Sequence, residues 1–292
     1  ADGSGFKEKN GFNILASSDE WFSPVHAEVG PDGALWVADW YNFIIQHNPT
    51  PRGFENGAGN AYINPLRDAQ HGRIYRIKYK AGEDSEVFDL KDAKGKDLIK
   101  ALKSENLFWR LTAQRLIVEK QDKSILSDLY ELIGDQKVDG AGINGSAINA
   151  LWALHGLGEL EGENQDALQA VEKALSHPSA AVRKNALRVL PKTASSLQAI
   201  LNSNILNDPD LHTRKYAFLA VSDMPFSEDA AKKLVEAAKV KENGEDAYLP
   251  QAVFAAVLAH PTEFAKLDNS KALQASADAE FSLTDRISRS LV

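Results

Sequence analysis

Two patterns of apolar and polar positions divide the chain. Over residues 1–80, apolar residues come in short bursts that alternate with polar ones and are broken by turn-forming stretches, which is typical of strands and loops. From about Leu98 onward, apolar residues recur at i, i+3, i+4 and i+7, which predicts helices. The stretch between them is charged and poor in large apolar groups. We therefore expect a domain boundary near residue 90, with a β segment at 1–90 and a helical domain at 91–292.

The first part contains a predicted hairpin. PVHAEVG (24–30) and ALWVADW (34–40) read as strands, joined by a tight turn at Pro31, Asp32 and Gly33. HGRIYRIKY (71–79) alternates in the same way and predicts a third strand. Three or four short antiparallel strands correspond to one blade of a β-propeller and do not make a stable domain alone.

The helical part repeats itself. Five segments align so that an alanine recurs at spacings of 37, 36, 31 and 35 residues, at Ala113, Ala150, Ala186, Ala217 and Ala252. A small residue at that interval suits a helix that packs closely on the next repeat, so we expect these alanines to be buried. A second helix is predicted between successive segments. The pattern predicts a mainly α fold, an α-solenoid of about five helix pairs, preceded by a short antiparallel β segment.

Two segments carry a family resemblance. HPSAAVRKNALRVLP and NDPDLHTRKYAFLAV each have a proline-containing turn that leads to an arginine, Arg183 or Arg214, and then to a small and apolar helix. Residues 98–265 thereby resemble HEAT and armadillo-type repeats. The arginines are expected to donate hydrogen bonds to turn carbonyls and to acidic residues of adjacent repeats.

Composition narrows the class of protein. The 33 Lys and Arg against 41 Asp and Glu give a net charge of −8, which excludes a chain-wide nucleic-acid surface. With no cysteine, the chain has no disulfide, Cys-ligated metal site, Cys nucleophile or CxxCH haem attachment. No stretch approaches the ~18 uninterrupted apolar residues of a membrane span. The first residues hold neither an initiator Met nor a signal peptide's apolar core, and we read the chain as a fragment or a processed form.

A second resemblance involves the β segment. PVHAEVGPDGALWVADWYNFIIQHNPTP, then LRDAQHGRIYRI, then HEAT-like helices, looks like the junction of propeller and helical domain in bacterial membrane-bound, sorbosone/glucose-dehydrogenase-like proteins. The match is specific at ten positions: Asp32, Gly33, Asp39, Trp40, Tyr41, Asn42, His47, His71, Gly72 and Arg73.

This resemblance implies a setting for the chain. In that family, a propeller, a HEAT-type domain and often a c-type cytochrome domain follow one another, and the proteins are secreted to the periplasm or cell surface. A quinone of the PQQ type would belong to the full-length parent and not to this fragment. The earlier blades and the CxxCH motif are missing, so no catalytic residue is carried over.

Candidate ligand-binding residues gather where the second strand ends. They are Asp39, Trp40, Tyr41 and Asn42. The resemblance adds His47, His71 and Arg73 as further candidates. In the competing interpretation, Asp39 and Asn42 cap the turn, while the aromatic rings of Trp40 and Tyr41 pack under the following loop.

Two other patterns resemble known sites but indicate ordinary structure. His26, His47, Asp68 and His71 are spaced by 21, 21 and 3, which fits no standard metal loop, so no metal is predicted. Gly140, Gly142 and Gly145 spell GxGxxG after a predicted helix, and therefore indicate an inter-helix loop and not a dinucleotide site.

Two functions remain open. The chain is the C-terminal part of a secreted sugar-dehydrogenase-like protein, whose solenoid is a scaffold that docks a protein partner or an adjacent domain, with little activity of its own. Alternatively, it is a non-enzymatic module that binds protein or polysaccharide. A stripe of aromatics or of one charge sign favours the second, and a quinone pocket completed around Asp39–Asn42 favours the first.

Overall fold

The computed structural model of the chain describes most of the β segment and of the helices. The residues described are 2–9, 11–43, 52–53, 55, 70–82, 85–162 and 164–262, together with 283 and 287. In this part of the chain, no helix is both long enough and apolar enough to cross a membrane.

The chain divides into two compact units. The β unit consists of Lys9–Asp89 and Ser104–Trp109. The helical unit consists of Ala1–Glu8, Leu90–Lys103 and Arg110–Val292. The break between Asp89 and Leu90 lies beside the boundary expected from the sequence. Two short segments fall on the opposite side of it: the first eight residues, which group with the helices, and Ser104–Trp109, which group with the sheet.

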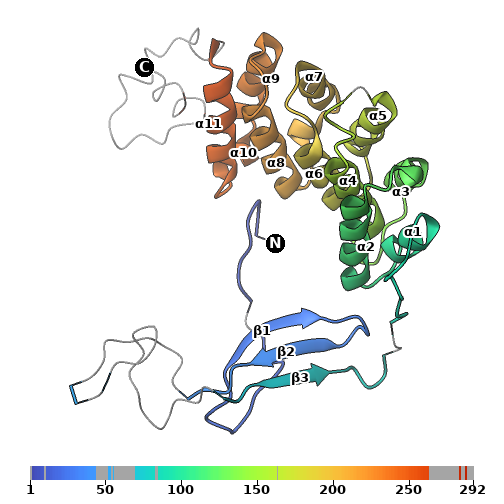
Figure 1. The fold of residues 1–292 in the computed structure, drawn as a ribbon. Coiled ribbons are helices and arrows are strands. Elements are labelled where there is room, and N and C mark those ends of the chain that lie inside the picture. Colours follow the sequence, from blue (N-terminus) through green and yellow to red (C-terminus); the bar gives the residue numbers. More distant parts are fainter. Residues whose placement is uncertain are drawn as a thin grey trace. The chain divides into compact units, whose positions relative to one another are not determined.

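The β unit is built on one antiparallel sheet. Its strands are β1 (Pro24–Val29), β2 (Leu35–Asp39) and β3 (Arg73–Ile77), in the order β1-β2-β3 (Figure 1). The hairpin and the third strand are therefore confirmed. Gly33 has a φ of +77°, which favours glycine in the turn between β1 and β2. In the second pair of strands, Asp39 lies opposite Arg73, which brings two of the candidate residues together.

The segment Ser104–Trp109 completes the β unit. The Trp109 indole N–H donates to the Pro31 carbonyl at 2.8 Å, and the Phe88 ring meets the Trp109 ring at 5.4 Å between centroids, nearly edge-on. The Asn106 side-chain amide donates to the Gly30 carbonyl at 2.9 Å. The hairpin turn is thus covered by residues that follow it by more than seventy positions.

The helical unit is made of short helices. In the part of the chain that is described, the α-helices are α1 (Lys96–Leu102), α2 (Leu107–Lys120), α3 (Leu126–Gly134), α4 (Gly145–Gly156), α5 (Gln165–Ala174), α6 (Ala180–Val189), α7 (Ala194–Asn202), α8 (Leu211–Ser222), α9 (Glu228–Ala238), α10 (Lys241–Glu245) and α11 (Leu249–Ala259). The first turn of α2 belongs to the β unit.

Local sequence explains where many of these helices begin. An N-cap side chain accepts a hydrogen bond from the N–H three residues on, which satisfies a donor left free by the helix. The caps are Asn144 for α4, Asn164 for α5, Thr193 for α7, Asp210 for α8 and Ser227 for α9. Gly140 and Gly142 lie in the loop before α4, so the prediction of an inter-helix loop at the GxGxxG pattern is confirmed.

The helices pack in two rows. One row runs α4, α6, α8 and α11, each in contact with the next, and the other runs α3, α5, α7 and α9. Contacts of α3 with α4, α5 with α6, α7 with α8 and α9 with α11 join the rows (Figure 1). The two-row arrangement places the apolar face of each helix between its neighbours.

The recurring alanines are buried as predicted. Ala113, Ala150, Ala186 and Ala217 have no exposed surface, and Ala252 is 3% exposed. They lie on α2, α4, α6, α8 and α11. A small side chain at this position lets neighbouring helices approach closely, and the predicted burial is confirmed for these five alanines.

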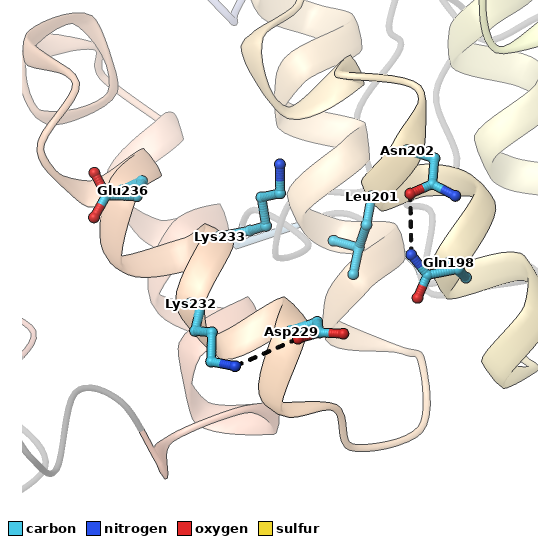
Figure 2. A pocket seen from close by; sticks show the side chains of 7 residues that line it. All are labelled: Gln198, Leu201, Asn202, Asp229, Lys232, Lys233 and Glu236. Atoms are coloured by element: carbon cyan, nitrogen blue, oxygen red, sulfur yellow. Dashed lines mark hydrogen bonds and ion pairs between the residues drawn. The ribbon is translucent and has the colours of Figure 1, made fainter.

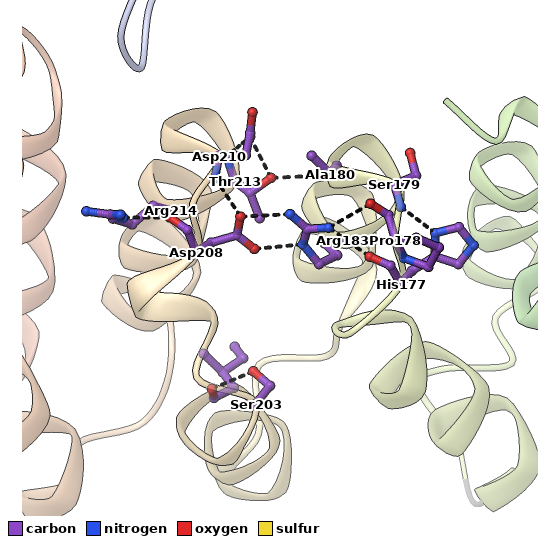
Figure 3. A network of polar contacts seen from close by, with 11 residues as sticks. His177, Pro178, Ser179, Ala180, Arg183, Ser203, Asp208, Asp210, Thr213 and Arg214 are labelled. Carbon is purple, nitrogen blue, oxygen red and sulfur yellow. Dashed lines mark hydrogen bonds and ion pairs between the residues drawn. The ribbon is translucent and has the colours of Figure 1, made fainter. Parts of the chain in front are cut away.

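The two arginines carry a polar network between successive turns. Arg183 on α6 donates from Nε and Nη2 to both carboxylate oxygens of Asp208, at 2.7 and 2.8 Å, and from Nη1 to the His177 carbonyl at 2.8 Å (Figure 3). Arg214 on α8 donates to the Asp208 carbonyl at 2.8 Å and to Oδ1 of Asn243 at 2.9 Å. The prediction is confirmed for Arg183, which bonds both a turn carbonyl and an acidic residue of the next turn. Arg214 bonds a turn carbonyl as predicted, but its partner in the next turn is the amide of Asn243 and not an acidic residue.

Candidate functional site

The Asp39 carboxylate forms the centre of the candidate site in the β unit. Its side chain is fully buried at the end of β2. Oδ1 accepts from the backbone N–H groups of Ser23, at 2.7 Å, and Tyr41, at 2.9 Å. Oδ2 accepts from Nε of Arg73 at 2.9 Å. Ser23 in turn donates its hydroxyl to the Asn42 carbonyl at 2.7 Å, so the chain after β2 is fastened to the segment before β1.

Arg73 extends this centre into a cluster of charges and rings. Its Nη1 donates to Asp19 at 2.8 Å, and its guanidinium carbon lies 4.0 Å from the centroid of the Tyr41 ring. The Trp21 ring lies 5.6 Å from the Tyr41 ring, and the His71 ring meets Tyr41 edge-on at 6.4 Å. A guanidinium over an aromatic face is attracted by the negative face of the ring.

These contacts fix the ionisation of the cluster. Burial works to raise the pKa of Asp39, but the N–H groups of Ser23 and Tyr41 and the Arg73 guanidinium outweigh it, and the pKa is lowered. The Trp21 N–H, followed by Arg73, lowers the pKa of Asp19. Both groups are therefore carboxylates at neutral pH and cannot donate a proton as general acids.

The structure brings together four of the seven predicted site residues. Asp39, Tyr41, His71 and Arg73 meet in the cluster described above, and Asn42 contributes its carbonyl beside them. Trp40 stands apart, with 42% of its surface exposed and its N–H bonded to the Ser23 carbonyl.

The other residues considered above as ligands lie outside the cluster or outside the described residues. His47 and Asp68 lie outside the described residues. His26 is exposed on β1, 3.6 Å from the Glu28 carboxylate. Among the residues that the structure describes, no three His, Cys, Asp or Glu side chains are grouped so that they could hold a metal.

The helical unit carries a surface that the sequence reasoning missed. Arg188 on α6 holds its guanidinium carbon 5.0 Å from the Trp152 ring on α4 and 5.7 Å from the Tyr216 ring on α8. The Lys184 ammonium lies 5.7 Å from Tyr216. The Trp152 indole N–H donates to Asn185 at 2.9 Å, which fixes the ring. We call Trp152, Lys184, Arg188 and Tyr216 the basic–aromatic face.

The repeat register held a signal for this face. Trp152 and Arg188 each stand two positions after a repeat alanine and are therefore 36 residues apart, equivalent positions on neighbouring helices. Tyr216 directly precedes the next repeat alanine. A groove of about 280 Å³ lies beside these side chains. Reading the residues that flank the alanines, and not only the alanines, would have found the face.

A second depression lies between α7 and α9. Its volume is about 400 Å³, and it is lined mainly by polar and charged side chains, which Figure 2 shows. Gln198 donates to Asn202 at 3.0 Å, and Lys232 pairs with Asp229 at 3.5 Å. Glu236 pairs with Lys239 outside the depression at 2.8 Å. These are exposed pairs within single helices, the usual arrangement of a solvent-facing surface.

Comparison with known proteins gives one match. Residues 1–81 match a domain of unknown function, DUF7133. No curated protein and no solved structure matches the chain significantly. The matched region contains all three strands and ends shortly after β3, so it leaves the helices from α1 onward outside.

Proposed function

We propose that the helical unit is an α-solenoid of the HEAT or armadillo type, with about five helix pairs, that serves as a docking scaffold. Three observations support it: the two rows of helices, the buried alanine at each repeat, and the arginines that join successive turns. Stacked repeats present one residue per repeat on a common surface, which is how such folds bind extended partners.

The basic–aromatic face carries the proposal. Neither Lys184 nor Arg188 forms an ion pair with a described residue, although the chain as a whole is acidic. Arg and aromatic side chains dominate the binding energy of protein interfaces, and a guanidinium held between rings is already ordered before a partner binds. The partner that suits this face is an acidic segment of a protein or of an adjacent domain.

The test uses two double variants with the same change in charge. We expect Lys184→Ala/Arg188→Ala to weaken binding of a fluorescein-labelled hexaglutamate peptide about tenfold, with the wild-type affinity falling as salt is added. Lys232→Ala/Lys233→Ala on α9 is the control and should retain wild-type affinity. Equal affinities of the two variants, measured by fluorescence anisotropy, would reject the basic–aromatic face as the docking surface.

Polysaccharide binding is the alternative. The aromatic rings of Trp152 and Tyr216 on this face favour it. Flat rings stack on sugars, but both rings lie within cation–π distance of Arg188, which favours an acidic partner. Cellohexaose is the probe that separates the two. Saturable binding of cellohexaose that Trp152→Ala abolishes and Lys184→Ala/Arg188→Ala leaves intact would replace the docking proposal with this one.

For the chain as a whole, we propose that it is the C-terminal part of a secreted, sugar-dehydrogenase-like parent protein. That parent would be located outside the cytoplasm of a bacterium. The three-stranded sheet is then the remnant of a propeller blade, the quinone belongs to the missing blades, and an adjacent c-type cytochrome domain is one candidate partner. In support, the polar groups at the end of β2 are bound within the β unit: Asp39 accepts hydrogen bonds from Ser23, Tyr41 and Arg73.

This part of the proposal predicts an inactive chain. A quinone needs convergent groups from several walls of a cavity, and one blade supplies a single wall. The purified chain should neither retain pyrroloquinoline quinone through gel filtration nor oxidise aldoses. Stoichiometric retention, read from the absorbance of the protein peak, would place the cofactor site in this chain and overturn the assignment.

A further inference from the structure

The first residues of the chain fold into a tight turn on the helical unit. Asp2 and Gly5 exchange two backbone hydrogen bonds, each 3.0 Å from nitrogen to oxygen. The turn between them contains Gly3, with a φ of +58°, and Ser4. The three residues Gly3-Ser4-Gly5 group with helices that follow them by more than 200 positions.

Every polar group of Ser4 is bound by the helical unit. Ser4 is fully buried. Its N–H donates to one carboxylate oxygen of Asp246 at 2.8 Å, and its hydroxyl donates to the other at 2.5 Å. The Lys215 ammonium donates to the Ser4 carbonyl. A carboxylate that binds an N–H and a hydroxyl of one residue distinguishes serine from a residue without the hydroxyl.

Glycines flank Ser4 on both sides, and the site leaves no room for a side chain at either position. A Cβ added to Gly5 would lie 2.2 Å from the Tyr248 ring, and one added to Gly3 would lie 2.3 Å from the Asp246 carboxylate. Such distances require the site to open. On the other side of the turn, the Phe6 ring stacks at a tilt on His212, with 4.5 Å between centroids. As folded, the site therefore has no room for a side chain on either neighbour of Ser4.

Asp246 is held in place independently of this segment. Its Oδ1 also accepts from the N–H groups of Tyr248, at 2.8 Å, and Leu249, at 2.9 Å, at the start of α11. Although burial works to raise its pKa, the Ser4 hydroxyl and these N–H groups lower the pKa to about 2. A receptor carboxylate is thus fixed by α11 whether or not the turn is bound.

We propose that Lys215, Asp246 and Tyr248 form a peptide-recognition site for a Gly-Ser-Gly turn, and that residues 2–6 of this chain are its resident ligand. The site differs in residues and in ligand chemistry from the basic–aromatic face, and it stands whether or not that face docks a partner.

The first experiment tests whether the turn is bound in the full chain. Hydrogen exchange of the Ser4 amide should be slowed in the wild type, because its N–H is bonded and buried. Gly5→Ala should speed that exchange by about tenfold or more, since the added Cβ collides with Tyr248. Gly11→Ala is the matched control, because a Cβ there meets nothing within 4 Å. A Ser4 amide that exchanges as fast in the wild type as in a free peptide would overturn the proposal.

The second experiment tests recognition itself. A fluorescein-labelled peptide with the sequence of residues 1–9 should bind the Gly5→Ala chain saturably, because its site is vacant, and the wild type about tenfold more weakly, because the linked segment competes at high effective concentration. Replacing the serine of the peptide by alanine should abolish binding. If the Gly5→Ala chain and the wild type bind the peptide equally, or if neither binds it at millimolar concentration, the site is not a recognition site.

Discussion

The two units are stabilised by different interactions. In the helical unit, aliphatic side chains such as Leu98, Leu151 and Ile200 are fully buried, and the packing repeats from helix to helix. In the β unit, the centre is an ion pair of Asp39 and Arg73 under aromatic rings. A small sheet buries too little surface for an aliphatic core, so directional polar contacts determine its structure. The helical unit should therefore respond to changes of volume and to loss of its buried Arg183–Asp208 pair, whereas the β unit should respond mainly to changes of charge.

The largest expected effect comes from breaking the buried ion pair of the helical unit. Asp208→Asn should lower the free energy of unfolding by about 2–3 kcal/mol, because it removes a buried charge that binds Arg183 and leaves the guanidinium without its partner. The measurement is denaturant unfolding followed by far-UV circular dichroism.

Asp229→Asn on α9 is the control for this prediction. Asp229 pairs with Lys232 on the surface, with both side chains more than half exposed, and such pairs contribute little. If both variants unfold at the same denaturant concentration, the turn-to-turn network does not stabilise the repeats, and the helical unit depends on its apolar packing alone.

A smaller effect tests close packing between repeats. Ala186→Leu should cost about 1–3 kcal/mol, because the added atoms have no space between helices at a position with no exposed surface. Ala194→Leu, at the exposed first residue of α7, adds the same atoms where solvent accepts them. Thermal melting of both variants measures the difference. An unchanged midpoint for Ala186→Leu would mean that the repeat register does not place the helices in close contact.

The smallest expected effect is a change in pH dependence in the β unit. The pKa of Asp39 is lowered from its ordinary value of 3.8, so the folded unit binds fewer protons than the unfolded one. This contribution to stability is fully present above pH 4 or so and is lost as the pH falls through the folded pKa. Arg73→Gln should flatten this acid dependence, because the guanidinium lowers the pKa of Asp39.

The readout is tryptophan fluorescence during acid titration, with Arg115→Gln as the control. Arg115 forms an exposed pair with Glu119 on α2, so its removal should leave the titration of the β unit unchanged. If Arg73→Gln leaves the acid transition as steep as in the wild type, the carboxylates of the cluster do not govern its stability, and the contrast between the two units fails.

Much of the fold could be predicted from the sequence because it depends on neighbours along the chain. The period-two alternation predicts β1, β2 and β3, and the recurrence of Ala150, Ala186 and their equivalents predicts buried helix faces. Part of the candidate site could be predicted on the same basis: Asp39 and Tyr41 are two residues apart, and a side-chain carboxylate that accepts the N–H two residues on is a local contact. Arg73 is a candidate only because of the family resemblance of the β segment. The antiparallel register of β2 and β3 places it opposite Asp39.

Only the tertiary structure decided which residues far apart in the sequence come into contact. Nothing near Ser4 predicts Asp246, which is 242 positions away. Likewise, Trp152 and Tyr216 become one surface only after α6 has packed between α4 and α8 and brought Arg188 to both rings. Periodicity is set by the geometry of a single helix or strand, and it therefore appears in the sequence. The meeting of distant side chains depends on how the helices stack, which no local pattern encodes.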